Sequence, residues 1–495
     1  MRLLLMWPSS GPATMEFIKE LNQSPHRVVY WLGHHSAASD AAREFPEIIF
    51  HSHAAAERVE PAAGVDTRDF LPPSEALINS LTKVESLILT MLNRFYDTMC
   101  VDERRHIYYK MLTYWVGVLD KYQPEAIIFP VDPHWVFDFL VFELARRRGL
   151  KTFMFSETKI SDRILWMEDF RAGSAALLAA QARNAGKNFS LSDISDDIVK
   201  YYQPRASASY NELPGHIDFL KKKHSWRYRW LHDSKIIKSF KDGSFFKRAR
   251  IWAIRWWQND RKKMLRQLLV AGRHIILPNL KKEYAAVAKP PDWGKKFVYL
   301  ALQVQPERTT SPLGDIFCDQ LLVAEIVSAA LPPNWIIYVK EHPIQWLRIG
   351  IDYSSNRYPG YYKKLAAIPN VQVVPVETNT YELNNKSEAV VTVTGSPGLE
   401  ALLRSKPVII FGYPWYKDCP GVFRVNSVDS CRYVFNKIIE GYRFDQQVLI
   451  NYLKSLDEAT IRGFIAQSNA KASTFNQAQS LHNMAELIRS ELARK

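Results

Sequence analysis

The clearest candidates for chemistry are three polar loops in the second half of the chain, each directly after an apolar stretch. In "IIYVKEHPIQ", the residues Lys340, His342 and Pro343 follow the apolar run 336–339. A lysine ammonium and an imidazole placed together could neutralise a phosphate leaving group without a metal ion. The alternative is that His342 is an ordinary loop histidine.

The second loop lies in "AVVTVTGSPGLEALLRSKPVIIFG". Thr394, Gly395 and Ser396 form the turn, and Pro397 stands where the first turn of a helix accepts a proline. Free amides at such a helix start, with two hydroxyl groups beside them, form a phosphate site. The alternative is a capped strand-to-helix turn without a ligand.

The third loop is "LALQVQPERTTSPLG", which contains Gln303, Gln305, Pro306 and the hydroxyl-rich residues 309–311. It would suit a sugar or a nucleotide, and it would also suit a plain surface loop. Since ligands of parallel α/β sheets bind at the carboxyl ends of the strands, three such loops at successive strand ends favour a nucleotide or phosphate site.

The elements that must position these loops alternate between short apolar strands and helices, which predicts parallel sheets. "RLLLMW", "HRVVYWLG" and "KTFMFSET" mark strands of a first unit, and "KFVYLALQ", "NWIIYVKE" and "PVIIFG" mark a second. The predicted fold class is α/β and GT-B-like, with two Rossmann-like, doubly wound domains that face a cleft.

We expect four regions along the chain. Residues 1–170 form an N-terminal Rossmann-like, acceptor-side domain, and residues 171–290 a mostly helical, basic and aromatic insertion or interdomain region. Residues 291–445 form a C-terminal Rossmann-like, nucleotide-sugar-binding domain, and residues 446–495 a helical tail.

Several familiar signatures are absent, among them the Walker A loop, GxGxxG, HExxH and a strict DxD. Without DxD, a donor whose diphosphate is held through a metal is less favoured. The four cysteines are scattered without metal-ligand spacing, which indicates a reducing cytosol. We therefore expect neither a metal nor a cofactor, the sugar nucleotide being a substrate.

"QVQPERTTSPLG", "VKEHPIQ" and "VTVTGSPGLEALLRSKPVIIFG", with "FPVDPHWVFDFLVFELARRRGLKTFMFSET" in the first half, resemble the bacterial capsular polysaccharide synthesis proteins, which include the β-Kdo transferases. The resemblance covers about residues 120–165 and 295–425. It implies a metal-independent GT-B enzyme with QP and HP motifs that uses CMP-activated 3-deoxy-ulosonic acids. Pro397 departs modestly from the pattern, since Thr or Ala is expected there.

Carried over to this sequence, the resemblance assigns the donor site residue by residue. Lys340, His342 and Pro343 would contact cytidine and phosphate, while Thr394, Gly395 and Ser396 would hold the phosphate. Gln305 and Pro306 would form the QP element beside the donor sugar, and Glu377 would bind the ribose hydroxyls. Glu400, one helical turn later, either belongs to this site or stabilises the helix start.

Transfer at a ketosidic carbon needs a carboxylate on the opposite wall of the cleft, as a base for the acceptor hydroxyl or as a nucleophile. The candidates are Asp132 and His134 in "PVDPH" and Glu157 in "FSET", with Asp162 and Arg163 close behind. Arg163 could bind a donor carboxylate through two parallel hydrogen bonds. Alternatively, "DPH" is only a turn and Glu157 only a helix cap. The residues do not decide between retention and inversion.

One segment carries the whole excess of positive charge. The net charge is +14, and residues 221–273 contain 17 Lys/Arg against 3 Asp/Glu, which leaves the remainder neutral. Its "FFKRARIWAIRWWQNDRKK" predicts a helix with Trp and Phe on one face and basic residues on the other. Such a helix could bind an anionic membrane surface, pack on the protein, or bind nucleic acid, and we favour the membrane.

No apolar run is long enough to span a bilayer, and the first residues are expected to form a strand rather than a signal peptide. We therefore expect a cytoplasmic enzyme, peripheral at the inner face of the cytoplasmic membrane. It would transfer Kdo or a related ulosonic acid from CMP to a glycan or lipid-linked acceptor in capsule or lipopolysaccharide synthesis. The alternatives are a CDP-alditol phosphotransferase, a transferase for another nucleotide sugar, and a nucleic-acid-binding protein.

Overall fold

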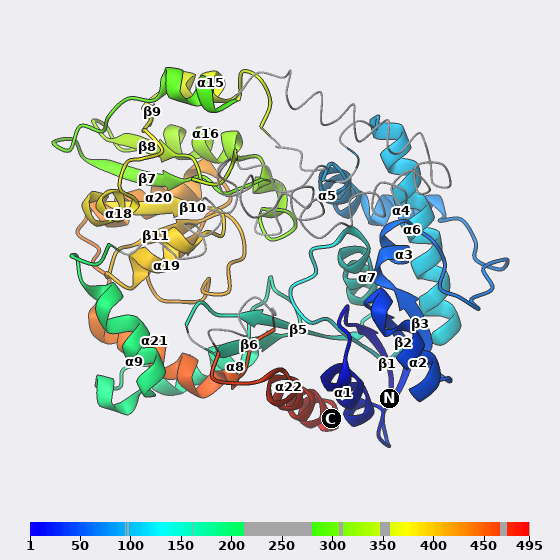
Figure 1. Ribbon diagram of the computed structural model, residues 1–495. Coiled ribbons are helices and arrows are strands. Elements are labelled where there is room, and N and C mark those ends of the chain that lie inside the picture. The colour runs from blue at the N-terminus through cyan, green and yellow to red at the C-terminus, as the bar shows by residue number, and fades with distance from the viewer. Residues whose placement is uncertain are drawn as a thin grey trace, which may run out of the picture.

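The computed structural model describes residues 1–94, 96, 99–160, 162–211, 280–305, 310–346, 357–465 and 473–494. Two separate sheets, each flanked by helices, make up this part of the chain (Figure 1). The predicted α/β class with two Rossmann-like domains in a GT-B arrangement is confirmed.

The first sheet has seven strands in the order β13-β6-β5-β4-β1-β2-β3. Its strands are β1 (Arg2–Met6), β2 (Arg27–Gly33), β3 (Ile49–Ser52), β4 (Ala126–Ile128), β5 (Lys151–Glu157), β6 (Arg163–Met167) and β13 (Ile461–Arg462). The first five are parallel, and β6 and β13 extend the sheet in antiparallel fashion. The carboxyl ends of β1 to β5 therefore share one edge.

Helices cover both faces of this sheet. In chain order they are α1 (Pro12–Leu21), η1 (His35–Ala37), α2 (Ala38–Glu44), α3 (His53–Glu57), α4 (Glu75–Ser80), α5 (Thr82–Leu92), α6 (Val101–Tyr122) and α7 (Val136–Arg147). Successive β1 side chains point to opposite faces: Leu3 and Leu5 join the core under α1, and Leu4 and Met6 join the core under α5 to α7. A continuous apolar run is thus buried on both sides, as a parallel sheet requires.

The second sheet has six parallel strands in the order β12-β11-β10-β7-β8-β9. They are β7 (Phe297–Ala301), β8 (Ile336–Lys340), β9 (Val371–Val373), β10 (Ala389–Thr392), β11 (Val408–Ile410) and β12 (Val422–Arg424). One face carries α15 (Leu280–Val287), η3 (Asp315–Cys318), α16 (Gln320–Ala330), α17 (Tyr361–Ala367) and α20 (Val428–Ile439). The other face carries α18 (Thr380–Lys386) and α19 (Ser396–Leu402).

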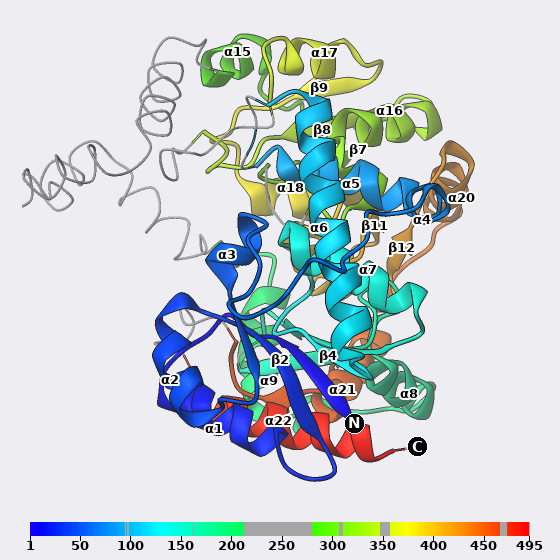
Figure 2. The same ribbon diagram turned by 90° about the vertical axis from the view of Figure 1, so that its right-hand side faces the viewer.

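The last fifty residues return to the first domain. Helix α21 (Gln446–Ala459) packs on α8 (Ala175–Asn184), and β13 joins the edge of the first sheet. Helix α22 (Gln477–Ala493) packs beside α1, as Figures 1 and 2 both show. The tail is therefore not purely helical as predicted, because Ile461 of β13 pairs with Ile164 of β6 and adds a strand to the first sheet.

The region expected as an insertion is described only in part. Its described elements are α8, η2 (Leu191–Asp193), α9 (Asp196–Ala206) and α15. The predicted basic and aromatic helix within residues 221–273 lies outside the described residues. In the described ranges, no helix is both long and apolar enough to cross a membrane.

Candidate functional site

The loops after β7 and β10 touch each other, as expected from adjacent parallel strands. The Gln303 side-chain amide donates to Thr394 Oγ1 at 3.0 Å, and the Thr394 backbone N–H donates to Gln303 Oε1 at 3.0 Å. Both side chains are more than nine-tenths buried. This two-way contact joins two loops that are 91 residues apart in sequence.

Two backbone amides of the turn expected to hold phosphate already donate to side chains of the protein. The Thr394 amide is bound to Gln303, and the Gly395 amide donates to Thr392 Oγ1 at 3.1 Å. Ser396, the exposed first residue of α19, has an amide and a hydroxyl without a hydrogen-bond partner in the described ranges. Of the three predicted phosphate ligands, Ser396 therefore presents the most available donors.

His342 follows β8 and is partly exposed at the same edge. Its Nδ1 accepts a hydrogen bond from the Ile344 amide at 3.4 Å, so in the neutral ring Nε2 carries the proton. An Nε2–H group is a donor and suits a phosphate oxygen. Pro343 lies in the turn that follows, and the turn holds His342 at the edge of the sheet.

Lys340 is 5% exposed at the end of β8. Its Nζ donates to Thr380 Oγ1 at 2.7 Å and to the Thr378 carbonyl, so it connects β8 to the start of α18. Glu377 is exposed in the turn before α18. Of the predicted QP pair, Pro306 lies outside the described residues. Gln305 is 7% exposed, and its side-chain amide donates to the Cys318 carbonyl.

Glu400 lies on α19 near positive charges of the second domain and of α9. Burial raises the pKa of Glu400 to about 7, although the charges of Arg404, Arg205 and Lys340 act to lower it. Arg205 lies on α9, which follows β6 and α8 in the chain. The ionisation of Glu400 near neutral pH thus depends on both parts of the molecule.

On the first domain, Asp132 and His134 follow β4. Asp132 is 8% exposed, and His134 Nδ1 donates to the Asp132 carbonyl at 2.9 Å. A carbonyl only accepts, so Nδ1 carries the proton of the neutral ring and Nε2 holds the lone pair. Burial raises the pKa of the nearby Asp138 carboxyl well above its ordinary value, although the backbone amides of His134, Phe139 and Trp135 act to lower it.

A pocket lies between the two domains at this point. It is lined by Asp132, Ser156, Met167, Phe170 and Gly173 of the first domain and by Tyr413, Pro414, Trp415 and Lys417 of the second. The Phe170 and Tyr413 rings meet edge to face at 5.8 Å, and Lys417 Nζ donates to the Ala172 carbonyl at 2.9 Å.

The second-domain wall of this pocket is joined to the phosphate turn. The Tyr416 hydroxyl donates to the Gly395 carbonyl, and the Gly412 amide donates to the Val393 carbonyl at 2.9 Å. A Cβ on Gly412 would lie 2.5 Å from the Thr394 methyl group, so the two loops pack directly together. Asp132 therefore shares a pocket with the direct sequence neighbours of two residues, Gly412 and Tyr416, that contact the phosphate turn.

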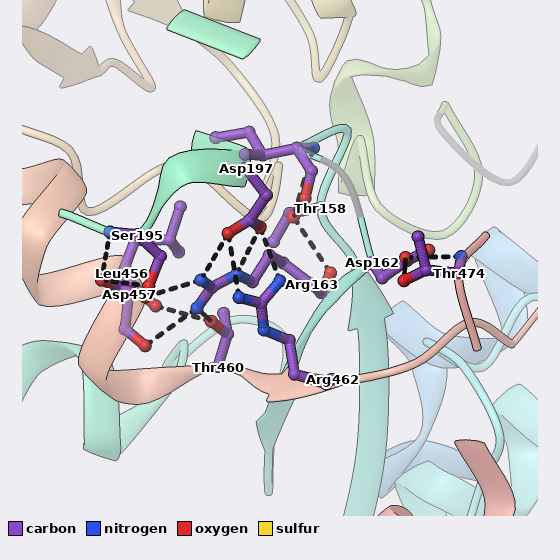
Figure 3. Close-up of polar contacts among 11 residues, drawn as sticks. Thr158, Asp162, Arg163, Ser195, Asp197, Leu456, Asp457, Thr460, Arg462 and Thr474 are labelled. Carbon is purple, nitrogen blue, oxygen red and sulfur yellow. Dashed lines mark hydrogen bonds and ion pairs between the residues drawn. The ribbon is translucent and has the colours of Figure 1, made fainter. Parts of the chain in front are cut away.

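Arg163 and Glu157 have a different environment (Figure 3 shows Arg163). All five Arg163 N–H groups are used: Nε and Nη2 bind Asp197, Nη2 also binds Asp457, and Nη1 binds the Asp457 carbonyl and Thr460. The Arg163 side chain is 2% exposed. It has no donor left for a ligand carboxylate, which corrects the role expected for it.

Glu157 and Asp162 also hold the C-terminal segment. Glu157 Oε1 accepts from the Ile465 amide at 2.5 Å, and Asp162 Oδ2 accepts from the Thr474 amide and hydroxyl at 3.0 and 2.8 Å. Neither residue lines the interdomain pocket. Of the predicted first-domain candidates, only Asp132 is brought to that pocket, with His134 beside it.

Several residues of this region were missed from the sequence. Ser156, Trp415 and Lys417 line the pocket, and Arg357 forms a buried pair with Glu341 behind the loops. "YPWYK" follows β11, so the strand-end rule could have found it. No group of three or more His, Cys, Asp or Glu that could hold a metal is present in the described part of the chain.

Known proteins are similar to parts of this chain. Residues 294–437 match the family model described as capsule polysaccharide biosynthesis protein. Over 84 residues, 17% of the chain, it is 34% identical to the capsule polysaccharide modification protein LipA of Neisseria meningitidis serogroup B (strain ATCC BAA-335 / MC58). The match spans 11% of that protein's length.

Two solved structures of Thermosulfurimonas dismutans KpsC are also similar. Its β-Kdo 2,7 transferase is 12% identical with a TM-score of 0.32, over 80% of this chain and 95% of that one. Its β-Kdo 2,4 transferase is 14% identical with a TM-score of 0.28, over 68% and 79%. The family match covers the greater part of the second domain, where the motifs of the resemblance lie.

Proposed function

We propose that this protein is a glycosyltransferase of bacterial surface polysaccharide synthesis. It transfers Kdo or a related ulosonic acid from a CMP-activated donor to a glycan or lipid-linked acceptor. The observation that carries the proposal is the interdomain pocket, which Asp132 lines from the first domain and Trp415 and Lys417 from the second. Tyr416, between these two residues in sequence, donates its hydroxyl to the Gly395 carbonyl of the phosphate turn. The family match of residues 294–437 supports the polysaccharide context.

The donor phosphate binds at the carboxyl edge of the second sheet. Ser396 offers an amide and a hydroxyl, and His342 offers Nε2–H. Lys340 adds a positive charge close behind this edge. Because phosphate departure leaves negative charge on CMP, these donors and charges stabilise the leaving group without a metal.

The acceptor hydroxyl approaches from the first domain. Asp132 is the carboxylate at the pocket and serves as the base or the nucleophile at the anomeric carbon. His134 Nε2, the unprotonated nitrogen of the neutral ring, accepts a proton from a hydroxyl group. The aromatic residues Phe170, Tyr413 and Trp415 line this pocket. Its volume is about 10 Å³, so its walls must separate before a sugar ring can pack against them.

Product mass spectrometry tests this proposal. The chain is incubated with CMP-Kdo, CDP-glycerol or UDP-N-acetylglucosamine and a set of glycan acceptors, with and without EDTA. We expect a Kdo mass increment that EDTA does not remove. A glycerol phosphate increment would instead identify an alditol phosphotransferase, and no transfer or CMP release with any cytidine donor would contradict the proposal.

We further propose that residues 221–273 bring the enzyme to an anionic membrane at the cytoplasmic face. The support is their charge, 17 Lys/Arg against 3 Asp/Glu, since anionic lipid contributes about 1 kcal/mol per nearby basic residue. The triple substitution Arg248→Glu, Arg250→Glu and Arg255→Glu should reduce the fraction of protein that floats with phosphatidylglycerol vesicles. Transfer to a soluble acceptor should persist, and equal loss of both would indicate a packing role.

A further inference from the structure

We propose that Arg357 is a positioning residue that fixes the loops after β7 and β8 in their donor-binding arrangement. This inference rests on the proposed function, because it gives those loops their role. Arg357 lies in the connection between β8 and α17, and no feature of the sequence around it marks it as part of a site.

Arg357 and Glu341 form a buried ion pair with both side chains 0% exposed. Arg357 Nε donates to Glu341 Oε2 at 2.9 Å, and Nη2 donates to Oε1 at 3.3 Å. The guanidinium also lies over the Tyr361 ring at 4.5 Å. This geometry needs the planar fork of arginine, which lysine does not supply.

The remaining donors of Arg357 reach the other loop. Nη2 donates to the Gln303 carbonyl at 3.1 Å, and Nη1 donates to Gln305 Oε1 at 3.3 Å. Gln303 is the residue whose side chain binds Thr394. One guanidinium therefore holds the loop after β7, which in turn holds the phosphate turn.

Glu341 holds the loop after β8 from the same side. Its Oε1 accepts from the His342 amide at 2.8 Å, and its Oε2 accepts from the Tyr362 hydroxyl at 2.7 Å. The Glu341 amide donates to the Tyr284 hydroxyl at 3.1 Å. The Glu341 carboxylate thus holds the backbone amide of His342, the residue predicted to donate a hydrogen bond to the phosphate.

Stability alone does not account for a charge pair at this position. Replacing a buried ion pair by apolar side chains of similar volume is often neutral or stabilising, since burying two charges is costly. Burial disfavours the Arg357 charge, but Glu341 and Tyr361 more than offset this and the pKa of Arg357 is raised. What the pair provides is a set of directed hydrogen bonds to both loops.

The double substitution Glu341→Gln/Arg357→Met separates positioning from stability. It leaves no uncompensated charge. The single oxygen of the introduced glutamine can still accept from the His342 amide, and its NH2 group can donate to the Tyr362 hydroxyl oxygen, which accepts as well as donates. The introduced methionine fills space but cannot donate to the loop after β7. The matched control is Glu85→Gln/Arg105→Met, the same substitutions in a 2.7 Å pair between α5 and α6 of the first domain. Arg357→Lys keeps the charge and removes the fork.

Two measurements are made on each full-length variant at a temperature well below its melting point: amide hydrogen exchange at 302–305 and 341–345, and calorimetric binding of CMP and UMP. In the double variant we expect exchange about 10- to 100-fold faster and nucleotide binding weaker by a similar factor, as lost hydrogen bonds to a charged group predict. Arg357→Lys should be intermediate, and the control should match the wild type.

Unchanged exchange in the double variant would overturn the positioning role, whatever the nucleotide result. Faster exchange with unchanged nucleotide affinity would also overturn it, because the loops would then be structural only. A wild-type chain that binds neither nucleotide would overturn the proposed donor site and with it the donor-binding role of Arg357. The three failures are thus distinguishable.

Discussion

Replacing Arg163 by Met removes the centre of an ion-pair cluster that holds the C-terminal segment on the first domain. Arg163, on β6, binds Asp197 at the start of α9 and Asp457 near the end of α21. Arg462, on β13, also binds Asp197, at 2.7 and 2.9 Å. The cluster therefore joins four elements that come from distant parts of the sequence (Figure 3).

The expected loss follows from burial. The Arg163, Asp197 and Asp457 side chains are 2%, 20% and 12% exposed. Removing one partner of a buried pair costs about 3–5 kcal/mol. Since Asp197 keeps Arg462 and Asp457 keeps its bonds to Ser195, we expect the lower end, about 3 kcal/mol.

The loss should depend on pH in one direction. Burial acts to raise the pKa values of Asp197 and Asp457, but hydrogen bonds and nearby charge outweigh it and both pKa values are lowered. Carboxylates with lowered pKa values stabilise the fold above their unfolded value of about 3.9, and this contribution is lost as pH falls through the folded value. The difference between wild type and Arg163→Met should therefore shrink below about pH 4.

Hydrogen exchange at the Gly463 amide, which donates to the Asp162 carbonyl at 3.0 Å beside β13, measures the effect locally. A loss of about 3 kcal/mol corresponds to exchange faster by about 100-fold. The control Arg432→Met breaks the ion pair of Arg432 with Asp429, whose side chains are 51% and 90% exposed. It should change the free energy of unfolding by less than about 0.5 kcal/mol. If Arg163→Met left exchange unchanged but weakened binding of the acidic donor, the structural role assigned to Arg163 would be refuted.

Four further predictions concern the site. Asp132→Asn should lower kcat by about 10²- to 10⁴-fold in the transfer assay, with an unchanged melting curve, because it removes the pocket carboxylate. Ser396→Ala should weaken CMP binding in calorimetry by about 3- to 10-fold, the loss of one hydroxyl hydrogen bond. The pKa of Glu400 is raised from 4.5 to about 7, so stability from its protonated form is lost as pH rises through 7. In thermal melts Glu400→Gln should match the wild type near pH 4 and exceed it at pH 8. In Gly173→Ala, a Cβ at positive φ, 2.4 Å from Asp418 Oδ2, should destabilise the fold by about 1–2 kcal/mol in urea and slow transfer while CMP still binds.

The sequence predicted the second domain well because its signal was local. Apolar runs such as 336–339 form central strands, and polar residues directly after them must gather at one edge of a parallel sheet. The contact between Gln303 and Thr394 is the direct result. Which amides stay available was not predictable, since the Thr394 amide is taken by a side chain 91 residues away.

Side-chain partners that come from remote segments were missed for the same reason. Arg357 belongs to a connection without a strand or helix pattern, so only the folded chain shows that it meets Glu341 and Gln303. Glu157 looked like a catalytic carboxylate at a strand end, but Ile465, 308 residues later, donates to it. The local sequence pattern predicts where a loop lies in the fold. It does not predict which hydrogen-bond partners from remote segments already bind the side chains of that loop.

Strand β6 explains why Arg163 was a plausible but mistaken candidate for a ligand site. Unlike β1 to β5, β6 runs antiparallel to its neighbour β5. Its first residue, Arg163, therefore lies beside the carboxyl end of β5, where the tail joins through β13. Its last residue, Met167, and the following Phe170 and Gly173 line the interdomain pocket. One strand thus connects the cluster that anchors the tail to the pocket wall. Loosening the tail should then move the acceptor side of the pocket.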